Sequence, residues 1–146
     1  MNLRNTAWNV IKWKFMKDRL GYSDDEMKLF RSNPRNEAVL SKAPELANKT
    51  IIAEVVQSEG CNSQHLVGDK FYFDGAGNLI TKLCPKRICI YALHSIAMQV
   101  FAAGELICAG INANDMKFKH AGCFDVGLEC GGWGHISMKI YVQDRQ

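Results

Sequence analysis

The chain lacks the long apolar runs that exported and membrane-spanning proteins carry. Residues 1–15 contain no uninterrupted apolar run of the signal-peptide kind, and no stretch approaches the roughly 20 uncharged apolar residues of a membrane span. The longest apolar segment, residues 88–111, is interrupted by His94, Gln99 and Glu105. We therefore expect this segment to be a buried helix, and the protein to be cytoplasmic and to have no membrane partner.

The sequence also lacks any Cys-x2-Cys pair, so the usual spacings of zinc fingers and ferredoxins are absent. It nevertheless has six cysteines among 146 residues. In the cytoplasm, glutathione and thioredoxin keep structural disulfides rare. Clustered cysteines in that compartment indicate metal ligation or thiol chemistry rather than a disulfide framework.

Positive charge is scarce in the part of the chain that holds the cysteines. Residues 1–50 contain ten Lys and Arg against six Asp and Glu, whereas residues 51–146 contain eight against nine. Binding that is driven by phosphate contacts requires clustered positive charge. We therefore expect no nucleic-acid partner.

Residues 1–49 are predicted to form a helical segment. Apolar side chains approximate one stripe along its first helix, namely Trp8, Ile11, Phe15 and Leu20. Ser23 and Glu26 have the spacing of a capping box, and Asn33-Pro34 is a second helix-start signal. Exposed aromatic surface is typical of interfaces. We expect these helices to cover the sheet of the following domain, or to bind a second copy or another protein.

Residues 50–146 are predicted to form an α+β domain with mostly antiparallel strands in the order β-β-β-α-β-β. Alternating or β-rich residues predict strands at 51–56, 70–73, 79–83, 123–129 and 136–142, and a main helix is predicted over residues 86–109. Gly131-Gly132 is predicted to turn between the last two strands. The complete chain is thus expected to be N-terminal helices followed by this domain.

Three motifs in this domain resemble a family of small uncharacterised proteins from bacteria and archaea. They are G-C-x3-H-x-V-G-D-x-F at residues 60–71, C-P-x2-I-C-x2-A-L at residues 84–93, and C-x-D at residues 123–125. The likeness covers about residues 51–142, and the N-terminal helices would make this chain a longer variant. The resemblance implies the identity of the domain and of its Cys and His positions, and it implies no activity.

The primary candidate site consists of thiol and imidazole side chains, namely Cys61, His65, Cys89 and Cys123. Soft and borderline metals prefer these ligands, so we expect zinc or an iron–sulfur cluster. Cys61 and His65 lie four residues apart in one loop. Cys89 lies in the first turn of the main helix, whose N-terminus favours a thiolate. Cys84, just before that helix, is the reserve ligand.

Cys130 and His135 form a separate and weaker candidate pair. If Gly131-Gly132 closes a regular hairpin, Cys123 and His135 lie roughly 20 Å apart, because a strand rises about 3.3 Å per residue. They could then share an ion only across a bulge. Asp125 shares the strand face of Cys123 and could orient His65 as an outer carboxylate.

Three functions follow from these patterns. The first is a metal- or iron–sulfur-binding subunit or accessory domain. The second is a thiol enzyme in which Cys89 is the nucleophile and His65 the base. The third is a partner-binding module without metal, in which the cysteines pack as small apolar side chains.

Overall fold

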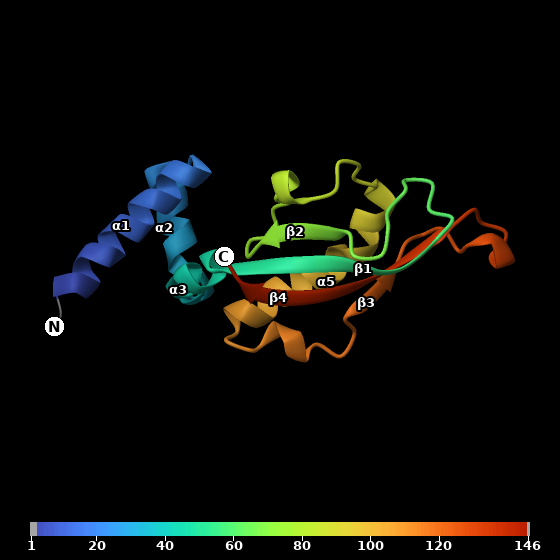
Figure 1. The fold of residues 1–146 in the computed structure, drawn as a ribbon. Coiled ribbons are helices and arrows are strands. Elements are labelled where there is room, and N and C mark those ends of the chain that lie inside the picture. The colour runs from blue at the N-terminus through green and yellow to red at the C-terminus, as the bar shows by residue number, and fades with distance from the viewer. Residues whose placement is uncertain (1–2, 146) are drawn as a thin grey trace. The chain divides into compact units, whose positions relative to one another are not determined.

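The computed structural model describes the backbone of residues 3–145 and the side chains of residues 11–145. The chain divides into two compact units, with the boundary between Ala43 and Pro44 (Figure 1). The sequence placed this boundary at residues 49 and 50, where the β-rich segment begins.

The first unit consists of the helices α1 (Leu3–Leu20), α2 (Asp24–Ser32) and α3 (Pro34–Ser41). Ser23 caps α2, because its hydroxyl accepts the N–H of Glu26 while the Glu26 carboxylate accepts the N–H of Ser23. Asn33 caps α3 directly before Pro34. Both predicted helix starts are confirmed, since each signal satisfies backbone donors that the helix leaves unpaired.

Aromatic packing joins α1 to α2, and an ion pair joins α1 to α3. Trp13 and Tyr22 each meet the ring of Phe30 edge-on, with ring centroids 6.2 and 5.9 Å apart. The Lys12 ammonium is buried and pairs with the Glu37 carboxylate of α3. A buried charge requires such a partner, so this ion pair ties α1 to α3.

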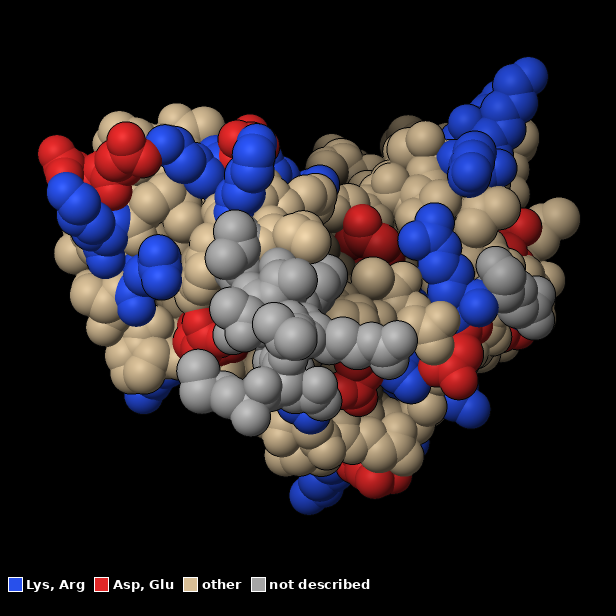
Figure 2. All heavy atoms as spheres, turned by 90° about the vertical axis from the view of Figure 1, so that its left-hand side faces the viewer, with Lys and Arg blue, Asp and Glu red and all other residues tan. Residues whose placement is uncertain are grey.

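Part of the predicted apolar stripe on α1 is exposed. Ile11 and Phe15 are both more than half exposed, and Trp8 lies outside the described side chains. Charges of both signs are interspersed on the face shown in Figure 2. In the first unit, Lys17 forms an ion pair with Asp24. The role of these helices in association stays a prediction.

The second unit is an α+β structure. Its elements are β1 (Lys49–Glu59), β2 (Lys70–Asp74), α5 (Ile90–Cys108), β3 (His120–Gly122) and β4 (His135–Asp144), with α4 (Ala43–Ala47) at the boundary and short 3₁₀ turns η1 (Thr81–Leu83), η2 (Ala113–Asp115) and η3 (Leu128–Cys130). The strands form one antiparallel sheet in the order β2-β1-β4-β3 (Figure 1). The predicted α+β class is confirmed.

The predicted strand at residues 79–83 is not present. Leu79 forms only an isolated bridge to Phe73, and the chain then turns through η1. The Tyr72 carbonyl accepts the N–H of Ile80 at 2.7 Å, as in a strand ladder, but the Tyr72 N–H donates to the sulfur of Cys84 at 3.3 Å. A further strand would have needed this N–H.

The core lies between one face of the sheet and α5. Alternate residues of the strands point to this face, and with the buried side of α5 they form one apolar cluster that includes Ile51, Ala53, Val55, Phe71, Ile96, Val100, Met138 and Ile140. Within the described residues, α5 is long and apolar enough to cross a membrane by length and composition. One side of α5 packs on the sheet and belongs to the core.

The backbones of Gly60 and Gly134 touch where β1 ends and β4 begins. A Cβ added to Gly134 would lie 2.1 Å from the carbonyl oxygen of Gly60, whereas a Cβ on Gly104 in α5 would meet nothing closer than 3.7 Å.

We expect Gly134→Ala to lower the free energy of unfolding by about 2 kcal/mol or more, as overpacking of a tightly packed site does. Gly104→Ala, the control, should raise it by up to about 1 kcal/mol through helix propensity. Urea denaturation measures both, and an unchanged Gly134→Ala variant would contradict the close approach.

Candidate functional site

A pocket of about 260 Å³ lies at one end of the sheet. It lies where β1 ends, β4 begins and α5 starts (Figure 1). Its lining includes the four primary candidate ligands, which are Cys61, His65, Cys89 and Cys123. Asp125 and His135 also line it, together with the aromatic side chains of Tyr91 and Trp133. Cys61 and Cys123, which are 62 positions apart in the sequence, therefore line one cavity.

His65 is the most buried polar side chain of this pocket, with 2% of its surface exposed. Its Nδ1 lies 3.6 Å from the carboxylate of Asp69, and its Nε2 has no hydrogen-bond partner among the described residues. A carboxylate beside Nδ1 favours the tautomer that carries its proton there. Nε2 is then left as a buried, unsatisfied acceptor, which is costly without a ligand.

Asp69 is the outer carboxylate that the sequence analysis missed. We predicted that Asp125 could orient His65, but the Asp125 carboxylate is engaged elsewhere. Asp69 lies four residues after His65, and its carboxylate also accepts the N–H of Leu66 at 3.0 Å. The His-x3-Asp spacing inside the first motif was the available signal for this contact.

A tight turn brings Cys61 and His65 together. The N–H of Gln64 donates to the carbonyl of Cys61 at 2.9 Å, and Gln64 has a φ of 61°, the left-handed region that side chains rarely adopt. The Arg87 guanidinium donates to the Gln64 side chain at 3.2 Å. This hydrogen bond links the turn to the segment that leads into α5, and backbone strain of this kind is often found at functional sites.

Cys89 is the residue that precedes the first turn of α5. Burial alone would raise the pKa of its thiol, but the N–H of Ala92, the hydroxyl of Ser63 and the N–H of Tyr91 outweigh burial and lower the pKa below its ordinary value. The two N–H groups do not form full capping hydrogen bonds to the neutral side chain. They act as the positive end of the helix, which stabilises a thiolate.

The carboxylate of Asp125 organises the loop that carries Cys123. It accepts the N–H groups of Gly127, Trp133 and Gly134 at distances between 3.0 and 3.3 Å. The loop is therefore compact where we predicted a strand over residues 123–129. An acidic side chain that binds several nearby N–H groups gives the backbone an alternative to a strand ladder.

Cys123 and His135 are neighbours, so the predicted separation of roughly 20 Å is wrong. The Cys123 sulfur lies 3.8 Å from Nδ1 of His135, because the Asp125 loop folds the intervening chain back instead of extending it. His135 Nδ1–H donates to the Asp125 carbonyl at 2.7 Å, and the Ser137 hydroxyl donates to Nε2 at 3.2 Å. Both ring nitrogens are engaged, so His135 positions this part of the pocket.

The remaining candidates lie outside the pocket. The Cys84 sulfur packs beside β2, where it accepts the Tyr72 N–H and lies 3.4 Å from the carbonyl of Ile80. Cys130 is exposed in η3 and does not line the pocket with His135. The pair that we predicted from Cys130 and His135 is therefore divided, and His135 lies with the primary candidates instead.

Among the side chains that the structure describes, no group of three or more His, Cys, Asp or Glu is already arranged to hold a metal ion. The pocket therefore brings the candidate ligands to one cavity without closing them on one point. No protein-family model, curated protein or solved structure matches the chain.

The Asp125 carboxylate predicts a pH-dependent stability. The N–H groups of Gly127, Gly134 and Trp133 hold the pKa of Asp125 below its ordinary value of 3.8, although desolvation opposes the shift. Because the folded pKa is lowered, the stability from this carboxylate is present at neutral pH and is lost as the pH falls through 3.8 toward the folded pKa. Asp125→Asn should therefore destabilise the protein more at about pH 7 than at about pH 3.

Urea denaturation of both proteins at each pH, with a chelator present, measures this difference. Equal losses of unfolding free energy at the two pH values would show that the Asp125 charge makes no contribution to the loop.

Proposed function

We propose that this chain is a small cytoplasmic protein that binds zinc or an iron–sulfur cluster through Cys61, His65, Cys89 and Cys123, and that it acts as a subunit or accessory domain. The observation that carries the proposal is the buried Nε2 of His65. This acceptor lacks a partner in a pocket that three thiols also line. A metal ion would satisfy it. Buried polar atoms normally have a hydrogen-bond partner, so a buried imidazole nitrogen without one needs an explanation, and a bound ligand provides it.

The surroundings of His65 support metal ligation. In metal sites, the ligating histidine donates its other ring N–H to a carboxylate or carbonyl, which fixes the tautomer and the orientation of the ring. The Asp69 carboxylate lies on the Nδ1 side of His65 at 3.6 Å, slightly beyond hydrogen-bond distance, and it is placed to become such a partner. The ring also packs edge-on against Phe71 at a centroid distance of 5.1 Å. The imidazole is thus held in one orientation before any ligand is present.

The donor set restricts the group that could bind. Three thiolates and one imidazole match a tetrahedral zinc site in which protein atoms fill every position. The same set also suits a cluster, since imidazole replaces thiolate on iron in some centres. Cys89 suits both zinc and a cluster, because the lowered pKa of its thiol favours the thiolate form that binds metal. Binding would draw the Cys61 and Cys123 loops inward, since the ligands do not yet converge.

Substitution of the four ligands tests this proposal. We expect Cys61→Ser, His65→Asn, Cys89→Ser and Cys123→Ser each to weaken zinc binding by more than about 100-fold, because loss of even an outer partner costs about 10–100-fold. Asp69→Asn, which removes the outer carboxylate, should cost about 10–100-fold. Cys84→Ser and Cys108→Ser are matched controls from outside the pocket and should bind as the natural chain does.

Metal analysis and visible absorption of anaerobically purified protein measure stoichiometry and distinguish zinc, which is colourless, from a cluster. Competition with a chromophoric chelator gives the affinities. A metal-free, colourless and fully folded protein that binds neither zinc nor iron would contradict the proposal.

A second function, thiol chemistry at Cys89, is favoured by the lowered pKa of that side chain. The helix N-terminus and Ser63 would activate the sulfur as a nucleophile. His65 lines the same pocket and is available as a base. However, no hydrogen bond joins His65 Nε2 to any described residue, so the nucleophile–base contact of a thiol enzyme is not formed. For this reason metal binding is the proposal that the geometry supports better.

Alkylation rates separate the two functions. In the metal-free protein at neutral pH, we expect Cys89 to react with iodoacetamide at least about tenfold faster than Cys108, because only a thiolate reacts and burial raises the pKa of Cys108. Ser63→Ala should slow Cys89 and leave Cys108 unchanged. Mass spectrometry of the labelled peptides gives both rates. If zinc protects Cys61, Cys89 and Cys123 together, metal binding is supported; if Cys89 alone reacts whether or not zinc is present, the thiol enzyme is favoured.

A further inference from the structure

Three of the six cysteines line one pocket, and each of them is a free thiol. They are Cys61, Cys89 and Cys123. All three are half-buried, so a molecule as small as hydrogen peroxide can reach them. The contacts of the three sulfurs differ, and this difference favours a reaction between two of them.

The turn that holds Cys61 contacts Cys89. Ser63 follows Cys61 by two residues, and its hydroxyl donates a hydrogen bond to the Cys89 sulfur. Both residues line the pocket. The N–H of Gln64 closes the turn on the Cys61 carbonyl at 2.9 Å. Cys61 therefore lies in the same short turn as the side chain that touches Cys89.

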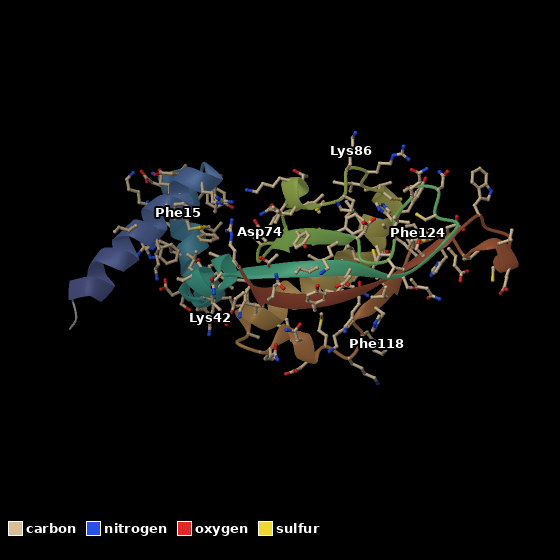
Figure 3. The ribbon with its side chains drawn as sticks, in the orientation of Figure 1. Phe15, Lys42, Asp74, Lys86, Phe118 and Phe124 are labelled. Atoms are coloured by element: carbon tan, nitrogen blue, oxygen red, sulfur yellow. The ribbon has the colours of Figure 1, made fainter. Side chains whose placement is uncertain are left out.

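A second contact joins the same two segments. The Arg87 guanidinium donates to the Gln64 side chain at 3.2 Å, and Arg87 lies two residues before Cys89. Lys86, directly before Arg87, marks this segment in Figure 3. A disulfide joins only residues whose Cα atoms approach within about 7 Å. Two hydrogen bonds that hold the Cys61 turn beside the start of α5 favour that approach.

The Cys123 sulfur is engaged on the other side of the pocket. It accepts the N–H of Ile136 at 3.4 Å, and it lies 3.5 Å from the carbonyl oxygen of Asp125 and 3.8 Å from Nδ1 of His135. The backbone N–H of Cys123 also donates to the Ile136 carbonyl at 3.0 Å. A disulfide from Cys123 would have to give up these contacts with β4 and its neighbouring loop.

We propose that Cys61 and Cys89 are an oxidation site, and that hydrogen peroxide converts them to an intrachain disulfide in the metal-free protein. One sulfur attacks a peroxide oxygen, the O–O bond breaks, and water leaves behind a sulfenic acid. The second sulfur then attacks the sulfenic sulfur, the S–S bond forms, and a second water leaves. The two thiols lose two electrons and two protons, and the peroxide is reduced to two molecules of water.

The disulfide would control metal binding at the pocket. This consequence rests on the proposed function, in which both sulfurs are metal ligands. Metals bind the thiolate, so the disulfide withdraws two of the four donors and leaves His65 and Cys123. Bound zinc would in turn hold the two sulfurs apart from peroxide. The chain would therefore bind metal when it is reduced and release it when it is oxidised.

Peptide mapping of the full-length chain tests the pairing. The reduced, chelator-treated protein is exposed to a stoichiometric amount of hydrogen peroxide, blocked with N-ethylmaleimide, and digested with trypsin and chymotrypsin without reduction. Cleavage after Arg87 and Tyr91 separates Cys89 from the other cysteines. We expect one cross-linked peptide pair, which joins Cys61 to Cys89, and the loss of two thiols per chain. Dithiothreitol should restore both thiols.

Variants distinguish this pair from the other thiols. Cys123→Ser should still form the disulfide, and so should Cys108→Ser, the control from outside the pocket. Cys61→Ser should form none and should leave sulfinic acid on Cys89. Arg87→Ala removes an exposed contact between the two segments, so it should slow cross-linking roughly two- to tenfold, as the loss of one hydrogen bond does.

Zinc affinity of the same samples tests the control of the site. We expect oxidation to weaken zinc binding by more than about 100-fold, because two donors are lost together, and dithiothreitol to reverse the loss. An oxidised chain that binds zinc as tightly as the reduced chain would overturn this control.

A cross-link that contains Cys123, or oxidation to sulfinic acid without any cross-link, would overturn the oxidation site even if the reduced chain binds zinc. If the reduced chain binds neither zinc nor iron, the proposed function and its control fail, whereas a cross-link between Cys61 and Cys89 would still establish the oxidation site. The two proposals can therefore fail separately.

Discussion

The packing of α5 on one face of the sheet is the contact on which the candidate site depends. Ile96 and Val100 bury against strand residues that include Ile51 and Met138, and this fixes the helix along its length. Its N-terminus is thereby held at the end of the sheet where β1 ends and β4 begins (Figure 1). This placement puts Cys89 in the lining of the pocket that the other candidate ligands also line.

Hydrogen bonds and close backbone contacts build the wall of the pocket that α5 does not supply. The Asp125 carboxylate gathers three N–H groups of its own loop, and a Cβ on Gly132 would lie 2.1 Å from its Oδ1. A Cβ on Gly134 would meet the Gly60 backbone equally closely. Only glycine permits such approaches. The glycines around Trp133 are therefore explained by packing, and they form no phosphate loop.

Local signals and periodicity were enough to predict much of the fold. The capping box at Ser23, the main helix and the strands at residues 51–56 and 136–142 each follow from short-range chemistry or from apolar spacing. The prediction of a strand at residues 123–129 was wrong. Apolar and polar residues do alternate there, but the backbone is not extended. The Asp125 carboxylate accepts hydrogen bonds from N–H groups of its own loop instead. The spacing of apolar residues cannot predict a hydrogen bond of this kind.

The sequence was enough to predict which residue types line the candidate site. It was not enough to predict which of these side chains lie next to each other. Thiol and imidazole side chains in loops identified Cys61, His65, Cys89 and Cys123 as residues that could meet, and they line one pocket. The distance of His135 from Cys123 was wrong because it assumed a regular hairpin. Asp69 was missed although its spacing from His65 was a signal, because a four-residue spacing in a loop does not by itself place two side chains together.

Tyr91 connects the pocket to the outer surface of α5. It lines the pocket, it is largely exposed, and its ring lies 6.4 Å from that of Phe124. In this fold one helix thus serves as a core element and, through its N-terminus, stabilises a thiolate at Cys89.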